Sequence, residues 1–366
     1  MPVAQSRPAR RSVRSAATAT AARQMPGPVM LDVAGHRLTS QERDRLAHPL
    51  TGAVILFARN YENPRQLAEL TAQIHDARDE PLLIAVDHEG GRVQRFRDNG
   101  FTQLPSMQDL GRYWERNPLQ AMRAATEIGY VLAAELRACG VDFSFTPVLD
   151  LDYGVSKVVG SRAFHRDPRI VAMLARALIQ GLSLADMRSC GKHFPGHGFV
   201  DADSHVAIPV DERDLEQIMA DDAMPYDWLG APVLSAVMPA HVIYPKVDAL
   251  PAGFSKVWVQ QILRQRLKYD GVVFSDDLTM QGASVAGDIT ARAEAALSAG
   301  CDMVLVCNRP DLADTVLASL KIAPSASSVS RIRALKPAVP FMDWNTLQSD
   351  SRYQYARDFR SQILSE

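Results

Sequence analysis

The sequence predicts an α/β protein with the fold of a single-domain (β/α)8 barrel of the TIM type. From residue 28 onward, eight short apolar runs alternate with helical stretches, which is typical of parallel strands buried on both faces. No Gly-rich phosphate-binding fingerprint follows the first run, which argues against a dinucleotide-binding sheet. Because eight parallel strands closed on themselves leave no unpaired edge, we expect a barrel and not an open sheet.

The alternation predicts where each element lies. We expect strands at residues 28–33, 52–57, 82–86, 141–148, 188–193, 233–242, 271–275 and 302–306. The pattern predicts helices at residues 39–48, 64–78, 118–139, 168–184, 257–267, 289–299 and 310–320. The fifth run is too polar to be recognised as a strand from its own pattern. We expect a strand there because the alternation of strands and helices requires one. After residue 321 the chain is polar, and we expect one helix near residues 353–364 that packs against the barrel exterior.

The composition excludes several classes of function. The 40 basic and 42 acidic residues give a net charge of -2, so no bulk field favours nucleic acid or an anionic membrane. No apolar run reaches the roughly 18 to 20 residues that a membrane span needs. Cys139, Cys190, Cys301 and Cys307 form no C-x-x-C pair, which indicates buried thiols in a reducing compartment. We therefore expect a cytoplasmic protein.

Residues 1–24 differ from the rest of the chain. They contain five arginines and no acidic residue, together with many Ala, Ser and Thr. This composition resembles a transit segment, and Arg10-Arg11 suggests a twin-arginine signal without the apolar region that should follow. We expect a disordered basic arm, or an upstream start codon with Met25 as the working one. The barrel and its C-terminal helical extension are then residues 25–366.

Polar residues stand at or just past the end of most predicted strands. Since the carboxyl ends of barrel strands meet at one mouth, we expect these side chains to gather there. A single aspartate at a strand end is more often a helix cap than a catalyst, but capping does not explain a full ring. The ring consists of Asp87, Asp150, Lys192, His193, His241, Asp276, Asp277 and Asn308. Such carboxylates and cations suit the binding of sugar-like hydroxyl groups.

The segment at residues 187–205 is the densest part of this pattern. It holds Lys192, His193, His197, Asp203 and His205, with Gly and Pro between them, and is expected to leave a strand end as a polar loop. A metal site built from these histidines and Asp203 is an alternative. Pro195 and Gly196 prevent His193 and His197 from sharing a helix face as in an H-E-x-x-H site. We therefore expect no metal and no cofactor.

Several motifs of the chain occur together in a known family. They are GKHFPGHG followed by DADSH, and also VDHEGGRVQR, GSRAFHRDP, MPAHVIY and GVVFSDDL. In this order and without large gaps, from about residue 28 to residue 308, they resemble the family 3 glycoside hydrolases. The closer resemblance is to the bacterial single-domain β-N-acetylhexosaminidases of peptidoglycan recycling. Residues 1–24 are not part of it.

The resemblance implies a role for individual residues. Asp276 is the implied nucleophile; Asp277 competes with it, but looser forms of the family motif keep only the first aspartate. His205, on a mobile loop, is the implied acid/base and is paired with Asp203. Gly196 and Gly198 would let this loop swing. The implied sugar-binding residues are Asp87, Arg95, Arg162, Lys192 and His193.

The resemblance also implies a reaction. We expect a monomeric retaining exo-β-N-acetylglucosaminidase that removes terminal GlcNAc from GlcNAc-anhydroMurNAc and its peptides, with no nucleic-acid or membrane partner. The alternatives within the fold are a β-glucosidase or xylosidase, and a phosphorylase that uses phosphate in place of water. Outside this chemistry, the alternatives are a non-catalytic sugar-binding barrel and a metal-dependent amidohydrolase.

Overall fold

The structure is a computed structural model that describes residues 25–202 and 208–364. The basic arm predicted at residues 1–24 therefore lies outside the described residues and stays a prediction. Among the helices that are described, none is both long and apolar enough to cross a membrane.

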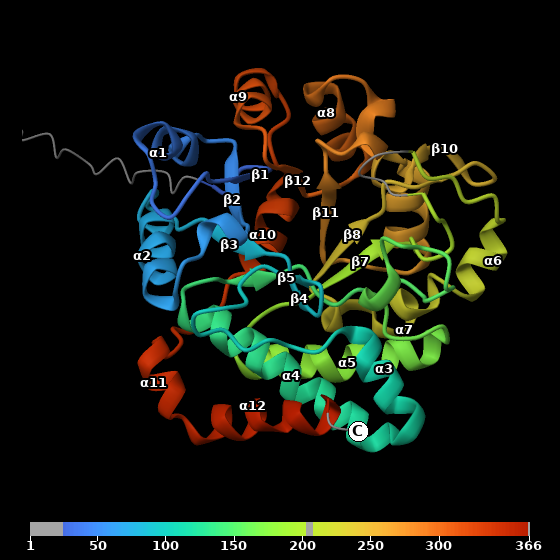
Figure 1. Cartoon of the computed structure of the whole chain (residues 1–366). Coiled ribbons are helices and arrows are strands. Elements are labelled where there is room, and N and C mark those ends of the chain that lie inside the picture. The colour runs from blue at the N-terminus through green and yellow to red at the C-terminus, as the bar shows by residue number, and fades with distance from the viewer. Residues whose placement is uncertain (1–24, 203–207, 365–366) are drawn as a thin grey trace, which may run out of the picture.

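Eight parallel strands form the barrel, and each predicted run overlaps one of them. They are β1 (Val29–Asp32), β2 (Thr51–Leu56), β3 (Leu83–Val86), β6 (Phe143–Ser144), β7 (Cys190–Phe194), β8 (Ala236–Pro239), β11 (Val272–Asp277) and β12 (Met303–Val306). The order of hydrogen-bonded neighbours is β6-β3-β2-β1-β12-β11-β8-β7. Parallel bridges from Phe143 to Arg188 and from Val148 to Lys192 join β6 to β7 and close the ring, seen from its mouth in Figure 1. The predicted barrel is confirmed.

All seven predicted helices are present around the strands. They are α1 (Ser40–Ala47), α2 (Pro64–His75), α4 (Pro118–Ala138), α5 (Pro168–Leu184), η4 (Val257–Arg266), α8 (Ile289–Ala299) and α9 (Pro310–Ser319). Their starts follow from local chemistry. The Thr39 side chain accepts from the Glu42 N–H, which makes Thr39 the cap of α1. Proline occupies the first turn of α2, α4, α5 and α9, where its missing N–H costs no hydrogen bond.

The connections contain further elements that the pattern did not predict. The helices are α3 (Met107–Arg116), α6 (Leu215–Ala220) and α7 (Met224–Val233), with short helical turns η1 (Ala58–Asn60), η2 (Gly160–Arg162), η3 (Ala252–Phe254) and η5 (Gln281–Ala286). Two small strand pairs are β4 (His88–Gly90) with β5 (Val93–Gln94), and β9 (Ile243–Tyr244) with β10 (Asp248–Pro251). The sixth strand was predicted to start at residue 233, which is wrong because Val233 ends α7.

The chain after residue 321 corrects one expectation. It forms three helices where one was predicted: α10 (Ala326–Ala334), α11 (Trp344–Ser349) and α12 (Ser351–Leu364). Helix α12 packs against α4 on the exterior, as expected. Helix α10 does not, because its Ile332 and the following Leu335 belong to the apolar cluster inside the barrel. This cluster includes Phe143, Phe145 and Phe274, and α10 closes it on the side opposite the mouth (Figure 1).

Candidate active site

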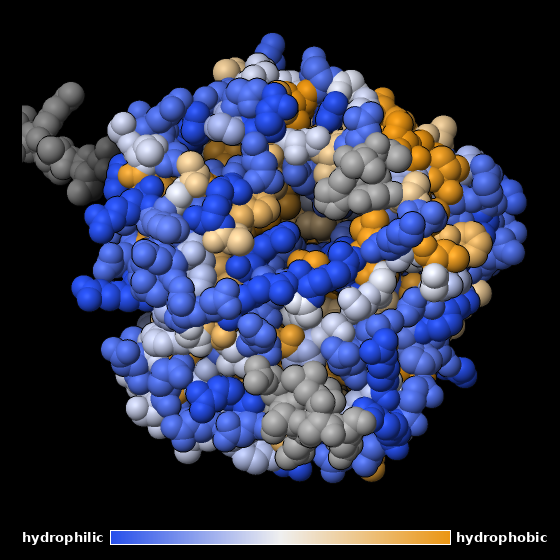
Figure 2. Space-filling view, viewed as in Figure 1, coloured by the Kyte–Doolittle hydropathy of each residue, from blue (hydrophilic) through white to orange (hydrophobic). Residues whose placement is uncertain are grey.

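A cavity of about 590 Å³ opens where the barrel strands end at their carboxyl side. Figure 2 shows this face hollowed near its centre and surrounded by hydrophilic residues. Residues from seven of the eight strands, or from the loops that follow them, line the cavity. Six predicted site residues are among them: Asp87, Arg95, Arg162, Lys192, His193 and Asp276. Of the ring predicted at the strand ends, Asp87, Lys192, His193, Asp276, Asp277 and Asn308 line the cavity, whereas Asp150 and His241 do not.

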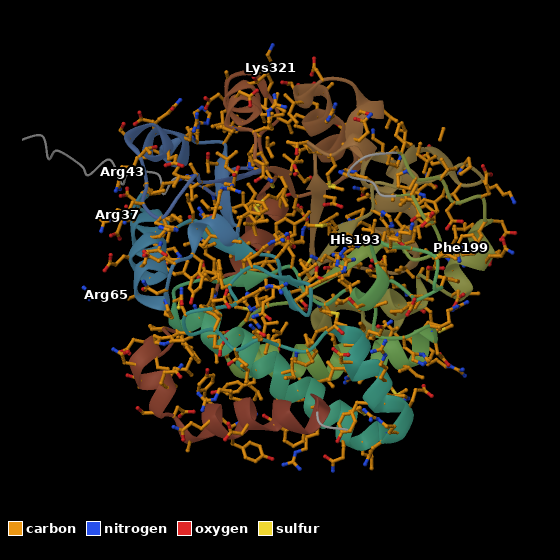
Figure 3. All side chains as sticks on the ribbon, viewed as in Figure 1. Arg37, Arg43, Arg65, His193, Phe199 and Lys321 are labelled. Atoms are coloured by element: carbon orange, nitrogen blue, oxygen red, sulfur yellow. The ribbon has the colours of Figure 1, made fainter. Side chains whose placement is uncertain are left out.

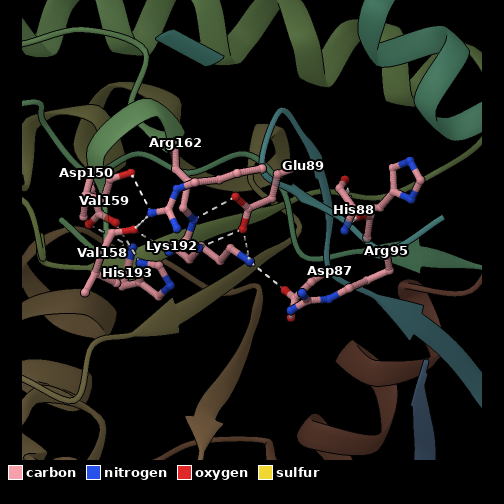
Figure 4. A network of polar contacts seen from close by, with 12 residues as sticks. Asp87, His88, Glu89, Arg95, Asp150, Val158, Val159, Arg162, Lys192 and His193 are labelled. Carbon is pink, nitrogen blue, oxygen red and sulfur yellow. Dashed lines mark hydrogen bonds and ion pairs between the residues drawn. The ribbon is translucent and has the colours of Figure 1, made fainter. Parts of the chain in front are cut away.

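Lys192, on β7, is at the centre of a buried network of charges. Its ammonium lies 2.8 Å from Asp87 Oδ1 and 2.7 Å from Glu89 Oε1. The Arg162 guanidinium donates to both oxygens of Glu89, at 2.9 and 2.8 Å. Figure 4 shows that these side chains come from separate elements and point toward one another. Since one cation is fixed by two carboxylates, and one carboxylate by two cations, the network holds a rigid polar wall for a substrate.

Glu89 was not predicted as a site residue, although a signal existed. Asp87, His88 and Glu89 follow β3 in extended conformation, and alternate residues of such a segment face the same side. Glu89 thus joins Asp87 at the cavity, while His88 points away from it (Figure 4) and packs against Phe96 and Phe101. Applying strand alternation past the end of the apolar run would have found Glu89.

The electrostatics of the network keep its members charged. Burial acts to raise the pKa of Asp87, but Lys192 and Arg95 hold it well below its usual range. For Glu89, burial acts in the same direction, yet Arg162 and Lys192 lower the pKa to about 2. Burial acts to lower the pKa of Lys192, whereas Asp87 and Glu89 raise it. The wall is therefore ionised throughout at neutral pH.

Arg95 extends this wall toward the mouth. Its Nη2 lies 3.4 Å from Asp87 Oδ2, and its guanidinium lies over the Phe57 ring, 5.7 Å from the centroid. Within the described residues, its buried Nε has no hydrogen-bond partner. The N–H at Nε is consequently available to a hydroxyl or carbonyl oxygen of a bound ligand.

Asp150, which follows β6, orients two histidines of the segment after β7. One oxygen accepts from the backbone N–H groups of His193 and His197, at 3.1 and 2.7 Å. The other lies 2.7 Å from His193 Nδ1. With Nδ1 engaged, the ring edge that carries Nε2 is left for the cavity that His193 lines (His193 is labelled in Figure 3). Asp150 therefore belongs to the site through its contacts with His193 and His197. The sequence had indicated it only as one of the polar residues at the strand ends.

The two adjacent aspartates of β11 have different surroundings. Asp277 Oδ1 accepts from the N–H groups of Thr279 and Cys307, at 3.0 and 3.2 Å, and Oδ2 accepts from the Thr279 hydroxyl at 2.8 Å. Burial, with Asp276 nearby, raises the pKa of Asp277 to about 6. Asp276 Oδ1 accepts from the Asp277 N–H at 2.8 Å. The geometry therefore occupies both oxygens of Asp277 with structural hydrogen bonds.

The family is established by similarity to known proteins. The N-terminal domain of glycosyl hydrolase family 3 matches residues 23–335. The chain belongs to glycosyl hydrolase family 3. It is 72% identical to a β-hexosaminidase of Bordetella parapertussis, over 93% of this chain and 96% of the relative, and 59% identical to one of Aromatoleum aromaticum, over 93% and 96%. It is therefore a glycoside hydrolase of the β-hexosaminidase type.

A solved family 3 structure has the same fold. NagZ from Neisseria gonorrhoeae, in complex with N-trifluoroacetyl-D-glucosamine, superimposes with a TM-score of 0.88 at 48% sequence identity, over 93% of this chain and 98% of that one. The barrel of this chain is thus also found in that relative over nearly its whole length.

Asp203 and His205, the predicted acid/base pair, lie outside the described residues. The described residues that precede them in the chain lie at the site, since His197 and Asp201 line the cavity. A Cβ on Gly196 would lie 2.5 Å from Asp222 Oδ1, and one on Gly198 would lie 1.9 Å from the Leu151 carbonyl oxygen. Close packing therefore explains both glycines. The predicted hinge stays a prediction.

The described residues were also compared with metal sites. No group of three or more His, Cys, Asp or Glu side chains within residues 25–202 and 208–364 could hold a metal ion. Asp203 and His205, two of the four ligands considered from the sequence, are not among these residues. In this family 3 barrel, the described geometry offers a wall of charged side chains and a carboxylate from β11 at one cavity.

Proposed function

We propose that this family 3 enzyme is a retaining exo-β-N-acetylglucosaminidase. It removes a terminal non-reducing GlcNAc from anhydro-muropeptide fragments in cell-wall recycling, with Asp276 as nucleophile and His205, supported by Asp203, as acid/base. One observation carries the proposal: Asp276 lines the same cavity of about 590 Å³ as the five proposed sugar-binding residues. Such a cavity has room for a saccharide ring between the two.

The assignment of the nucleophile is supported by the contrast between the two aspartates. A nucleophile needs an ionised oxygen that can reach the anomeric carbon. Both oxygens of Asp277 accept hydrogen bonds from Thr279 or Cys307, which hold this carboxylate in a structural role. Asp276 therefore attacks the anomeric carbon and forms a glycosyl-enzyme ester, and a hydrolysis step releases the sugar with retained configuration.

The assignment of His205 as the acid/base rests on the proton transfers that the reaction needs. The departing sugar oxygen needs a proton in the first step, and the attacking water must lose one in the second. Imidazole has an ordinary pKa of about 6.5 and can do both near neutral pH. A neutral base also brings no second anion close to the ester. Asp203 would orient the ring and stabilise the imidazolium, as a carboxylate does in hydrolase triads.

The substrate assignment is supported by a relative. The N. gonorrhoeae protein, 48% identical to this chain, has been solved with N-trifluoroacetyl-D-glucosamine. We infer that the charged wall around Lys192 receives the hydroxyl groups of the corresponding GlcNAc. Four buried cysteines without disulfides fit a reducing cytoplasm, where a monomeric enzyme would meet soluble wall fragments.

A comparison of two chromogenic substrates tests the proposal. The purified enzyme should hydrolyse 4-nitrophenyl β-N-acetylglucosaminide far faster than 4-nitrophenyl β-glucoside. A preference for the glucoside would replace the proposal by a glucosidase. Product analysis in phosphate buffer should give free GlcNAc; GlcNAc 1-phosphate as the main product would identify a phosphorylase.

A further inference from the structure

His241, which follows β8, is buried beside the end of β11. The sequence predicts His241 as a member of the polar ring at the mouth, but its side chain is 0% exposed and does not line the cavity there. Its ring stacks on Phe254, with the ring centroids 5.4 Å apart and the planes at 25°. The ring is therefore held behind the cavity wall and does not touch a sugar in the cavity.

Strand β11 is irregular where it carries its two aspartates. The pairing of β11 with its neighbour β8 (Figure 1) ends at Val273. Against β12, the register shifts between Phe274 and Asp277, and β11 has one residue more than β12 over this stretch. An extra residue of this kind re-aims a nearby side chain, and Asp276 lies within the stretch. The direction of Asp276 thus depends on contacts other than the regular ladder of the barrel.

His241 supplies such a contact from the β8 side. Its Nε2 lies 3.1 Å from the backbone carbonyl oxygen of Asp277. Because a carbonyl oxygen only accepts, Nε2 carries the proton and donates it. The backbone N–H of the same Asp277 donates to Asp276 Oδ1 at 2.8 Å. The two hydrogen bonds link the His241 ring to the carboxylate of Asp276 through the backbone of Asp277.

The surroundings of His241 keep its ring neutral. Nδ1 is buried and has no hydrogen-bond partner within the described residues. A protonated ring would bury an N–H at this atom without an acceptor, and burial lowers the pKa of His241. His241 therefore acts through its single donor at Nε2 and is not a cationic partner of Asp276.

We propose that His241 is a positioning residue for the nucleophile of this enzyme. By holding the Asp277 backbone, it keeps the Asp277 N–H on Oδ1 of Asp276 and directs the other carboxylate oxygen at the anomeric carbon. The inference rests on the proposed function, since it takes Asp276 as the nucleophile. A carboxylate that is free to rotate loses its near-attack geometry. Loss of the His241 donor should thus slow formation of the glycosyl-enzyme ester and leave sugar binding nearly unchanged.

His241→Phe removes the donor and keeps the stacking on Phe254. The Asp277 carbonyl still accepts from the Met280 N–H at 3.2 Å, so no acceptor is left unpaired, and the unpartnered Nδ1 is removed. We therefore expect a Tm equal to or above that of the wild type. The kcat for 4-nitrophenyl β-N-acetylglucosaminide should fall by about 10- to 100-fold with little change in KM, and labelling by a fluorinated glycosyl fluoride should slow by a similar factor.

Two further variants separate positioning from packing. His241→Gln keeps an N–H donor at the place of Nε2 but loses the stacking, so it should recover most of the rate although it is less stable. His241→Leu also lacks the donor, and replaces His241→Phe in the test if that variant does not fold. A rate that follows the stability of the variants, and not the presence of the donor, would overturn the proposal.

His88→Phe is the matched control. His88 is also 0% exposed and packs against Phe96 and Phe101, but it points away from the cavity (Figure 4), and neither ring nitrogen has a hydrogen-bond partner in the described chain. This substitution should leave kcat and the labelling rate unchanged. Equal losses of kcat in His88→Phe and His241→Phe would contradict a specific role of His241.

The outcomes also separate this proposal from the proposed function. A wild type labelled on Asp276, with the same labelling rate in His241→Phe, contradicts only the role of His241. A label on another residue, or a wild type that does not hydrolyse the N-acetylglucosaminide, contradicts the proposed function itself.

Discussion

Glu89 Oε1 lies 2.7 Å from the Lys192 ammonium, and both side chains are almost inaccessible, at 2% and 3% exposure. Because Arg162 also pairs with Glu89, this carboxylate neutralises two buried cations at once. Removing one partner of a buried ion pair costs more than the pair contributes, since the other charge is left uncompensated. The contact between Glu89 and Lys192 therefore contributes both to the stability of the fold and to the charge of the site.

Glu89→Gln should destabilise the protein by about 3 kcal/mol and raise KM for GlcNAc substrates. The loss should depend on pH. Because the pKa of Glu89 is lowered from 4.5 to about 2, its contribution is fully present above pH 4.5 and disappears as the pH falls toward 2. Denaturant unfolding at several pH values measures this. Glu62→Gln, at an exposed acid, is the control; equal effects of both substitutions would contradict the role of Glu89.

Asp150→Asn should lower kcat/KM by about 100-fold. The amide replaces an acceptor by a donor opposite His193 Nδ1, so the ring loses the orientation that the 2.7 Å contact fixes. Steady-state kinetics with nitrophenyl N-acetylglucosaminide measure the effect. Unchanged kinetics in a folded variant would show that the orientation of His193 does not matter for turnover.

Glu135→Gln tests a buried acid far from the sugar. Glu135, on α4, accepts hydrogen bonds from the Thr102 hydroxyl and N–H and from the Tyr353 hydroxyl of α12. Burial raises its pKa from 4.5 to about 7, so the contribution of the neutral form is full below pH 4.5 and is lost as the pH rises through 7.

The stability of the wild type relative to Glu135→Gln should therefore fall by up to about 3 kcal/mol between pH 4.5 and pH 7.5. Urea unfolding of both proteins across this range measures the difference. A difference that is constant with pH would contradict the raised pKa.

Asp276→Asn and Asp277→Asn should separate the two aspartates of β11. The first should lower kcat by more than about 10⁴-fold with little change in stability. The second should keep measurable turnover and lose about 1 kcal/mol of stability, because it weakens the contacts to Thr279 and Cys307. Kinetics and thermal unfolding of both variants check this, and the reverse pattern would reassign the nucleophile.

Much of the fold could be predicted because buried parallel strands leave a plain pattern. Even the polar fifth strand, β7, was placed correctly, since the alternation of a barrel demands a strand there. Helix α10 could not be recognised, because its sequence, ASSVSRIRA, buries only Val329 and Ile332. A helix that closes the end of a barrel opposite its mouth does not need the regular repeat of apolar residues by which a helix is recognised in a sequence.

The site was predicted from strand ends and motifs, which named Asp150 and most of the charged residues that face the cavity but missed Glu89. Glu89 and Asp150 act through contacts between elements far apart in the chain, such as Glu89 with Arg162 and Asp150 with His193. Sequence spacing does not reveal such pairs. The roles of Asp203 and His205 stay predictions, because both lie outside the described residues.

Covalent trapping tests the central claim most directly. A fluorinated N-acetylglucosamine-type glycosyl fluoride, which forms the glycosyl-enzyme quickly and releases it slowly, should add one sugar per protein molecule. Mass spectrometry of the digested protein should find that sugar on Asp276. A label on Asp277 or on any other residue, or an active enzyme that accumulates no label, would contradict the account.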